Sequence, residues 1–283
     1  MRNPNPRKGM SNIRNQLCRW GIRRWPALRT FLLYDRRLQR ILPASSRICD
    51  GPGFRIRTRP LKTSLIARSV YFTGIWEPEM TAMAQEKIRE GWHILDVGAD
   101  VGYYSMLFRS KCGPRGAVAV FEPDPEAIPF LEKNIALNGF ENIRVFRMAL
   151  SDHRGTGMMK PAGKGQLYPD RIGDGGNATV EMAPFDELWP ELGWDRLDLV
   201  KIDVEGAELS VLKGMERVLE KHHPHLLMEV HPRQLKEVFQ TSAGEVLHFL
   251  AERHSYRLLP VDTPVLPAAP ERNVTVWGDW MGT

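Results

Sequence analysis

The chain reads Ile94-Leu95-Asp96-Val97-Gly98-Ala99-Asp100-Val101-Gly102 at the point that decides its fold. An apolar run with one acid leads into a turn of small residues, which predicts a buried strand followed by a ligand-binding loop. Gly98 and Gly102 have no Cβ, so the backbone turns sharply there and a ligand can approach the loop N–H groups closely. This geometry favours a nucleotide-like ligand.

The spacing of the glycines distinguishes between two such ligands. A dinucleotide fingerprint needs three glycines as G-x-G-x-x-G, because a pyrophosphate sits against the helix that follows. Here Asp100 stands between the two glycines. A carboxylate at this place repels a pyrophosphate but can face a cation, such as the ammonium or sulfonium of S-adenosylmethionine. The loop therefore favours a methyl donor over a nicotinamide dinucleotide.

A second acid ends the next predicted strand, which covers Ala117–Phe121 and is followed by Glu122 and Pro123. At the tip of the second strand of a βαβ unit, a carboxylate accepts hydrogen bonds from both hydroxyls of a ribose. The alternative is that Glu122 stabilises the helix predicted from Asp124 onward. The two motifs, in this order, are fairly specific for a nucleotide site.

From residue 93 onward, apolar runs alternate with helical patterns, which predicts a doubly wound α/β sheet. The fourth strand, Leu197–Val204, runs directly into Glu205-Gly206-Ala207-Glu208, and the helix after it has a predicted buried stripe of Val211, Met215 and Val218. Leu226–Val230 is the fifth strand, and His231 follows it. Ligands bind at the carboxyl ends of the strands in such sheets, so these polar residues are candidates for the site.

Composition limits the class of protein further. The chain has 283 residues with 42% hydrophobic content, which is enough for a large core, and only three widely spaced cysteines, so neither a disulfide framework nor a zinc cluster is indicated. No apolar stretch is long enough to span a bilayer. We expect a cytoplasmic protein, or one peripheral to a membrane.

The positive charge is concentrated at the N-terminus. Residues 1–50 contain 12 Lys and Arg against Asp35 and Asp50, with tryptophans and leucines among them. This pattern is compatible with basic amphipathic helices. They would dock on the rest of the protein, lie on a membrane surface or bind an acidic partner; nucleic-acid binding is less favoured, because charge alone gives only non-specific attraction.

Four segments together resemble the FkbM-type S-adenosylmethionine-dependent methyltransferases: Asp96–Tyr104, Phe121–Pro123, Ala149–Asp152 and Lys201–Glu208. The resemblance covers about residues 70–232. It implies a class I methyltransferase fold (Rossmann-like), with a seven-stranded sheet and one antiparallel edge strand, and usually O-methylation of a hydroxyl on a sugar or natural product. The chain then divides into a basic arm (1–50), a lead-in segment (51–90) and the methyltransferase domain (91–283).

The resemblance also assigns residues. It implies that the cofactor site consists of the loop after the first strand, the ribose acid with its neighbour, and an adenine-side loop: Asp96, Gly98, Ala99, Gly102, Glu122, Pro123, Ser151 and Asp152. Many relatives carry Asn where this chain has Asp100, which adds a negative charge near the amino-acid end of the cofactor.

Methyl transfer to a hydroxyl is helped by a general base within hydrogen-bond reach. We expect Asp203, Glu205 or His231 in this role, with Glu205 and His231 favoured. The alternatives are that Glu205 stabilises a helix N-terminus and that His231 makes a structural hydrogen bond. Lys201 would form a buried ion pair with Glu229 or Asp203. Asp203, Glu229 and His231 have the chemistry of metal ligands, but we expect no metal.

The acceptor is expected to be a small molecule or a glycan. A nucleic-acid methyltransferase that holds its polymer with the basic arm is an alternative, disfavoured because no Asn-Pro-Pro-Tyr type of tetrapeptide occurs. A non-catalytic scaffold that binds the cofactor is a third possibility. The oligomeric state is open.

Overall fold

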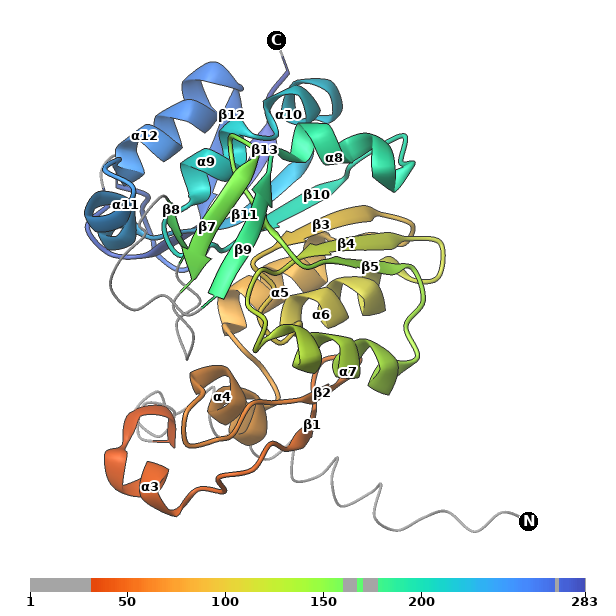
Figure 1. Cartoon of the computed structure of the whole chain (residues 1–283), viewed down its shortest axis with the longest axis vertical. Helices are drawn as coiled ribbons and strands as arrows, with labels where there is room; N and C mark the ends of the chain where they lie inside the picture. Colours follow the sequence, from red (N-terminus) through yellow and green to blue (C-terminus); the bar gives the residue numbers. More distant parts are fainter. Residues whose placement is uncertain (1–31, 160–166, 170–177, 268–269, 283) are drawn as a thin grey trace. The chain divides into compact units, whose positions relative to one another are not determined.

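The computed structural model describes residues 32–159, 167–169, 178–267 and 270–282. The chain forms two compact units, Met1–Pro78 and Glu79–Thr283, and Figure 1 shows the order of their elements. Most of the basic arm at residues 1–50 lies outside the described residues. Its role, and the boundaries expected near residues 50 and 90, therefore stay predictions.

The first unit contains two labelled helices and an antiparallel pair of strands: α3 (Arg36–Ile41), β1 (Ile48–Asp50), β2 (Arg55–Arg57) and α4 (Leu65–Thr73). Helix α4 begins where the Ser64 hydroxyl accepts a hydrogen bond from the N–H of Ala67 at 3.1 Å. The buried guanidinium of Arg68 donates to the carbonyl oxygens of Leu33 and Leu61 at 2.8 and 2.9 Å. This arginine therefore holds three segments of the unit together.

The second unit is built on a seven-stranded sheet with the order β12-β13-β11-β10-β3-β4-β5. The strands are β3 (His93–Val97), β4 (Ala117–Phe121), β5 (Ile143–Phe146), β10 (Leu199–Ile202), β11 (His225–Val230), β12 (Tyr256–Pro260) and β13 (Val274–Trp280). From β11 to β5 all pairs are parallel, while β13 is antiparallel to both of its neighbours. The doubly wound fold is confirmed, and the reversed strand lies one position in from the edge strand β12.

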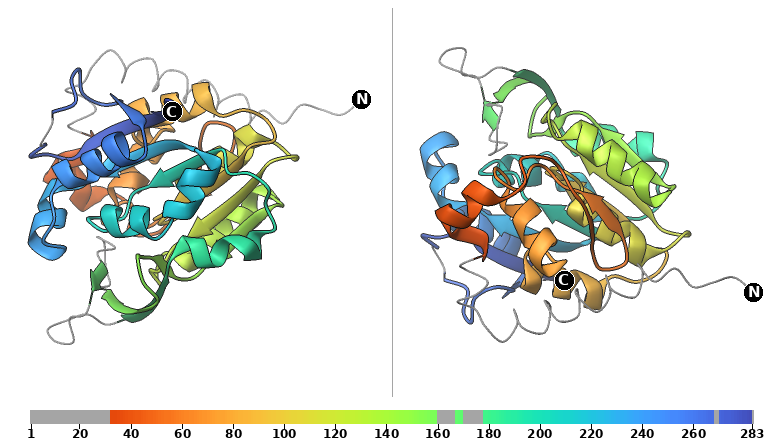
Figure 2. Two further views of the ribbon diagram at one scale, coloured as in Figure 1. Left: turned by 90° about the horizontal axis from the view of Figure 1, so that it is seen from above. Right: turned by 90° about the horizontal axis from the view of Figure 1, so that it is seen from below.

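Helices cover both faces of this sheet. One layer holds α5 (Pro78–Lys87), α6 (Tyr103–Cys112) and α7 (Ile128–Asn138), and the other holds α8 (Phe185–Leu192), α9 (Glu208–Lys213) and α10 (Glu216–His222). Seen from above in Figure 2, residues 208–222 lie in front of the strands, and α7 does so from below. The chain order of the strands reverses between β3 and β10, so the sheet has its switch point there.

The remaining helical residues follow β11: α11 (Pro232–Val238), α12 (Ala243–His248) and a π-helical turn at Phe249–Arg253. A second sheet has the order β6-β9-β7-β8 and consists of β6 (Ala149–Leu150), β7 (Gly155–Met159), β8 (Leu167–Pro169) and β9 (Ala178–Ala183). Its first strand, β6, begins at Ala149, shortly after β5 ends at Phe146.

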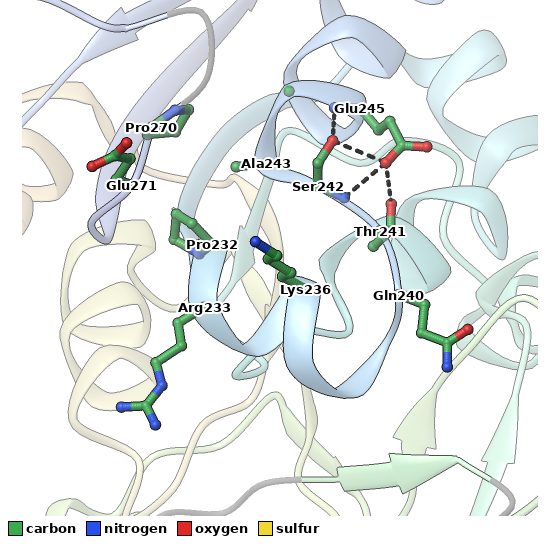
Figure 3. Close-up of a pocket in the computed structure, with 11 residues that line it drawn as sticks. Pro232, Arg233, Lys236, Gln240, Thr241, Ser242, Ala243, Glu245, Pro270 and Glu271 are labelled. Atoms are coloured by element: carbon green, nitrogen blue, oxygen red, sulfur yellow. Dashed lines mark hydrogen bonds between the residues drawn. The ribbon is translucent and has the colours of Figure 1, made fainter.

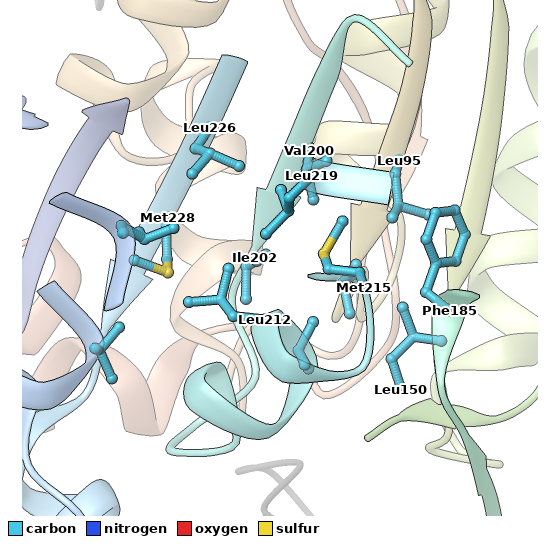
Figure 4. Close-up of a cluster of buried hydrophobic side chains, with 14 of the residues drawn as sticks. Leu95, Leu150, Phe185, Val200, Ile202, Leu212, Met215, Leu219, Leu226 and Met228 are labelled. Carbon is cyan, nitrogen blue, oxygen red and sulfur yellow. The ribbon is translucent and has the colours of Figure 1, made fainter. Parts of the chain in front are cut away.

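The core lies between the sheet and the layer of α8, α9 and α10 (Figure 4). Leu95, Val200 and Ile202 point from neighbouring strands toward Leu212 and Met215, and all five are buried. Strands buried on both faces require nearly continuous apolar sequence, which is the reason the runs before Gly98 and before Asp203 could be recognised.

The helix predicted through Val211, Met215 and Val218 is in fact two helices, α9 and α10, separated at Gly214. All three residues are buried, as predicted. A Cβ on Gly214 would lie 1.9 Å from the carbonyl oxygen of Ser151. The helix is interrupted at Gly214 because the backbone of Ser151 packs directly against this residue.

Within the described ranges, no helix has both the length and the apolar character needed to cross a membrane.

Candidate active site

The loop after β3 adopts the sharp turn that its glycines predict. Gly98 and Gly102 have φ values of 79° and 85°. A Cβ on Gly98 would lie 1.9 Å from the carbonyl oxygen of Asp203, so β3 and β10 approach each other too closely there for any side chain. Asp100 also has a positive φ of 46°. Asp and Asn tolerate this conformation better than other residues with a Cβ, which explains a short polar residue at position 100.

Glu122 closes the same loop from the end of β4. Its two carboxylate oxygens accept hydrogen bonds from the N–H groups of Asp100, at 2.6 Å, and Asp124, at 2.8 Å. Burial, helped by the charges of Asp100 and Asp124, raises the pKa of Glu122 to about 8 although the two hydrogen bonds lower it. Glu122 therefore holds the backbone of the loop after β3 and of the segment before α7, and its contact with a ribose stays a prediction.

Asp96 lies inside the protein. Its side chain has no exposed surface, and it accepts a hydrogen bond from the Ser105 hydroxyl at 2.5 Å. Burial raises the pKa of this carboxyl, while Lys201 and Ser105 oppose the shift. Asp96 thus connects β3, directly before the loop, to Ser105 in α6.

Lys201 joins the loop to the next strand end. Its ammonium group donates to the carbonyl oxygen of Gly98 at 2.6 Å and lies 3.5 Å from Asp96 and 3.4 Å from Asp203. Of its two expected partners, Asp203 is the one that the structure places beside it. The buried lysine connects the predicted cofactor loop with the predicted catalytic residues.

Ser151 and Asp152 follow β6. The Ser151 hydroxyl donates to the Asp152 carboxylate at 3.2 Å, and the same carboxylate contacts His153 at 2.7 Å. Ser151 is buried against Gly214, whereas Asp152 is exposed. An exposed acid next to a fixed backbone is compatible with the adenine-side role expected for this pair, which stays a prediction, as do the positions assigned to Ala99 and Pro123.

Asp203, Glu205 and His231 meet at the carboxyl ends of β10 and β11. His231 is 2% exposed, and its Nε2 atom lies 3.7 Å from Asp203 and 3.8 Å from Glu205. Glu205 has a φ of 52°, and its carboxylate accepts a hydrogen bond from Gln234 at 2.8 Å. The sequence predicts these three residues at the same edge of the sheet. In the structure the carboxylates of Asp203 and Glu205 both lie within 4 Å of His231 Nε2.

Two further acids complete the cluster. Glu208, fully buried, accepts hydrogen bonds from the Nδ1 atom of His231 at 2.7 Å and from the N–H of Gly206 at 3.0 Å. Glu229 lies 3.6 Å from His231 Nε2 and accepts a hydrogen bond from Asn273 at 2.9 Å. Sequence reasoning gave Glu208 no role, although it stands in the quoted motif, and nothing local marked Asn273 or Gln234.

The electrostatics of the cluster follow from burial and mutual charge. Burial alone lowers the pKa of His231, but its hydrogen bond to Glu208 and the charges of the surrounding carboxylates outweigh this and raise the pKa to about 10. Burial raises the pKa of Glu229 to about 7, and the charge of Asp203 adds to the shift. Burial also raises the pKa of Glu205, against the charge of His231. His231, Glu229 and Glu205 therefore release their protons at a higher pH than the same groups would in water.

A pocket of about 710 Å³ lies along α11, and no residue of the cluster lines it. Figure 3 shows Lys236 and Arg233 on that helix at the pocket, which Pro232 also lines directly after His231. The turn before α12 forms another wall, where Ser242 and Glu245 make a capping box. Sequence reasoning missed this pocket because its walls come from α11, the following turn and Pro270–Glu271, which carry no shared motif.

Three proteins that are named as methyltransferases are similar in sequence to this chain. Methyltransferase SdnD of Sordaria araneosa is 30% identical over 156 residues, which is 44% of this chain and 60% of that protein. The hexuronic acid methyltransferase AglP of Haloferax volcanii is 26% identical and aligns over 74% of this chain and 80% of its own length. The 2-O-methyltransferase NoeI of Sinorhizobium fredii is 29% identical over 45% of this chain and 59% of its own length.

The match to a protein-family model spans most of the residues of the candidate site described above. The methyltransferase FkbM domain matches residues 96–258, from Asp96 in β3 to Leu258 in β12. This range is more than half of the chain, and it contains the loop after β3, Glu122 and the five residues Asp203, Glu205, Glu208, Glu229 and His231. With its loop, its strand order and this match, the protein belongs to the FkbM family of S-adenosylmethionine-dependent methyltransferases.

Proposed function

We propose that the protein transfers a methyl group from S-adenosylmethionine to a hydroxyl oxygen of a sugar, a glycan or a small natural product. The observation that carries this proposal is the contiguity of the two sites: Lys201 contacts both the Gly98 carbonyl and Asp203. An acceptor at the cluster would therefore lie next to a cofactor in the loop. The relatives named for hexuronic acid and 2-O methylation support a saccharide acceptor.

The residues of the loop fit the cofactor. Each carboxylate oxygen of Glu122 uses one lone pair for a backbone N–H, at 2.6 and 2.8 Å, and keeps another for a ribose hydroxyl. Gly98, Ala99 and Gly102 would admit the amino-acid end, Pro123 would border the ribose, and Ser151 with Asp152 would face the adenine. Asp96 has no exposed atom, so we assign it the task of holding the loop in place. When bound, S-adenosylmethionine supplies the electrophilic methyl group.

At the acceptor end, we assign proton acceptance to Glu205. Its side chain is 37% exposed, against 26% for Asp203 and 3% for His231, so it is the most accessible of the three. Gln234 fixes one of its oxygens and leaves the other free to accept the hydroxyl proton. Asp203 and His231 position the acceptor, and His231 is itself held by Glu208. Much of the rate gain in such a displacement comes from alignment and exclusion of water.

The test is transfer of a radiolabelled methyl group by the full chain to two acceptor pools, a saccharide extract that contains uronic acids and total RNA. We expect label in the saccharide pool that survives mild alkali, because a methyl ether is stable there and a methyl ester is not. Label only in RNA, or only in an alkali-labile product, would refute the proposal.

The role of Glu205 is tested by Glu205→Gln, with the exposed Glu252→Gln on the π-helical turn as control. Loss of a general base lowers turnover by about 10²- to 10⁴-fold, and we expect a fall in this range with cofactor affinity unchanged. The control should keep the parent turnover. Equal turnover in both variants would remove Glu205 from the mechanism.

A further inference from the structure

The cluster around His231 contains more carboxyl groups than cationic groups. Four carboxylates surround this imidazole: Asp203, Glu205, Glu208 and Glu229. Among the residues that the structure describes, the cations within 4 Å of these four groups are His231 itself and Lys201, and Lys201 also serves Asp96. Glu208 is fully buried and Glu229 is only 18% exposed, and buried carboxylates normally have a compensating charge. The four carboxyl groups outnumber the two cations, so the cluster can accept one more cation.

The buried imidazole is presented in the way that a metal ligand is. Its Nδ1 atom is fixed by Glu208 at 2.7 Å, and in metal sites the non-ligating nitrogen of a histidine usually donates to a carboxylate in the same way. Its Nε2 atom points at three carboxylates 3.6–3.8 Å away, beyond hydrogen-bond distance. No described residue makes a hydrogen bond with this atom, although the side chain is only 3% exposed.

From this arrangement we propose that Asp203, Glu229 and His231 bind one divalent transition-metal ion. One ligand atom from each of the three lies within 4.8 Å of the others. Two ligands of an ion at about 2.1 Å are at most about 4.2 Å apart, so a sub-ångström movement of the partly exposed Asp203 closes the set. The ion replaces the proton on Nε2. Glu205 is a neighbouring carboxyl group and is not one of the three ligands.

The donor set narrows the kind of ion. Imidazole favours Zn²⁺, Fe²⁺ and their neighbours, and carboxylates favour Mn²⁺ and Mg²⁺, so one nitrogen with two oxygens fits a first-row ion such as Mn²⁺ better than Ca²⁺. This inference replaces the expectation from sequence that the protein has no metal. A catalytic use of the ion, as a Lewis acid on the acceptor hydroxyl, rests on the proposed function, whereas binding of the ion does not.

The experiment is a titration of the metal-free full chain with Mn²⁺ alone, in which the paramagnetic resonance signal of free Mn²⁺ reports binding. We expect one saturable site per chain. Asp203→Asn and Glu229→Gln keep the shape of each side chain and remove its charge, and each should raise the dissociation constant at least tenfold. Circular dichroism of each variant shows whether it is folded.

Asp279→Asn is the matched control, because Asp279 has the same side-chain exposure as Asp203, 26%, and also contacts a histidine, His225, at 2.8 Å. It should bind Mn²⁺ like the parent. Absence of saturable binding up to about 1 mM Mn²⁺, which corresponds to about 4 kcal/mol of affinity, would overturn the proposal, and so would parent-like binding by a folded Asp203→Asn, Glu229→Gln double variant. Cofactor binding and methyl transfer are measured in separate assays. Failure to bind Mn²⁺ therefore does not refute the proposed methyl transfer, and absence of methyl transfer does not refute metal binding.

Discussion

Replacement of Gly98 by alanine tests the contact on which the whole site depends. Two costs are expected at this position. The φ of 79° is a conformation that costs a residue with a Cβ about 1–2 kcal/mol. The new Cβ would also lie 1.9 Å from the carbonyl oxygen of Asp203, and a forced backbone shift in a packed region costs about 1–3 kcal/mol. We therefore expect Gly98→Ala to lower the free energy of unfolding by about 2–5 kcal/mol.

Two other glycines separate these costs. Gly139, at the end of α7, has a φ of 59°, and no atom lies within 4 Å of the position that a Cβ would take there, so Gly139→Ala should show the conformational cost alone. Gly214 has a φ of −72°, and its Cβ would lie 1.9 Å from the carbonyl oxygen of Ser151. Gly214→Ala should show the steric cost alone. The change at Gly98 should be close to the sum of the other two.

Urea denaturation of the three variants, followed by tryptophan fluorescence, provides the free energies, and calorimetric titration provides the affinity for S-adenosylmethionine. Gly98→Ala should also weaken cofactor binding, because the loop moves away from β10, whereas Gly139→Ala should leave it unchanged. If Gly98→Ala costs no more than Gly139→Ala, the close approach of β3 to β10 is not a constraint and the reasoning is refuted.

Three further predictions use other contacts. Because the pKa of Glu122 is raised to about 8, its carboxyl is protonated below that pH, so affinity for S-adenosylmethionine should fall by up to tenfold per pH unit as pH decreases from 8 toward 6, and Glu122→Gln should lose this component of the slope in calorimetric titrations. Leu212→Ala removes a fully buried side chain and should cost about 2–5 kcal/mol in urea denaturation, whereas Leu259→Ala, at 39% exposure, should cost clearly less; equal losses would contradict the placement of the core. Tyr256→Phe removes the hydrogen bond from the buried hydroxyl to the Pro224 carbonyl, at 2.8 Å, and should cost about 1–3 kcal/mol in the same assay because the carbonyl is left without that donor; no loss would mean that the bond contributes nothing.

The pKa shifts of the cluster have a structural origin that differs from that of Glu122. Glu122 is surrounded by backbone donors and two neighbouring acids, so burial is the dominant cause of its shift. His231 is surrounded by carboxylates from three different segments, so the charges outweigh burial. The first environment comes from the loops after β3 and β4, whereas the second exists only because the carboxyl ends of β10 and β11 lie next to the first residue of α9, Glu208.

The amino-acid sequence by itself determined the central strands of the sheet and the sharp loop after β3. The strands ending at Val97, Phe121 and Ile202 are buried on both faces, so they had to be nearly continuous apolar runs. Glu122 and Asp203 directly follow the second and third of these strands, at the edge where ligands bind in such sheets. Gly98 and Gly102 could be identified because a positive φ restricts the choice of residue at a single position. These are constraints that act on neighbouring residues, and so they are visible in the order of the amino acids.

Tertiary structure alone decided what surrounds those residues. Lys201 was expected to pair with Glu229 or Asp203, but its additional contacts with Asp96 and the Gly98 carbonyl depend on the lateral pairing of β3 with β10. The division of one predicted helix at Gly214 depends on the backbone of Ser151, which is distant in sequence. Glu208 and Glu229 reach His231 from opposite sides because parallel strands and the helix that follows them bring remote positions within a few ångströms. Such proximity is a property of packing, and no local pattern of residues encodes it.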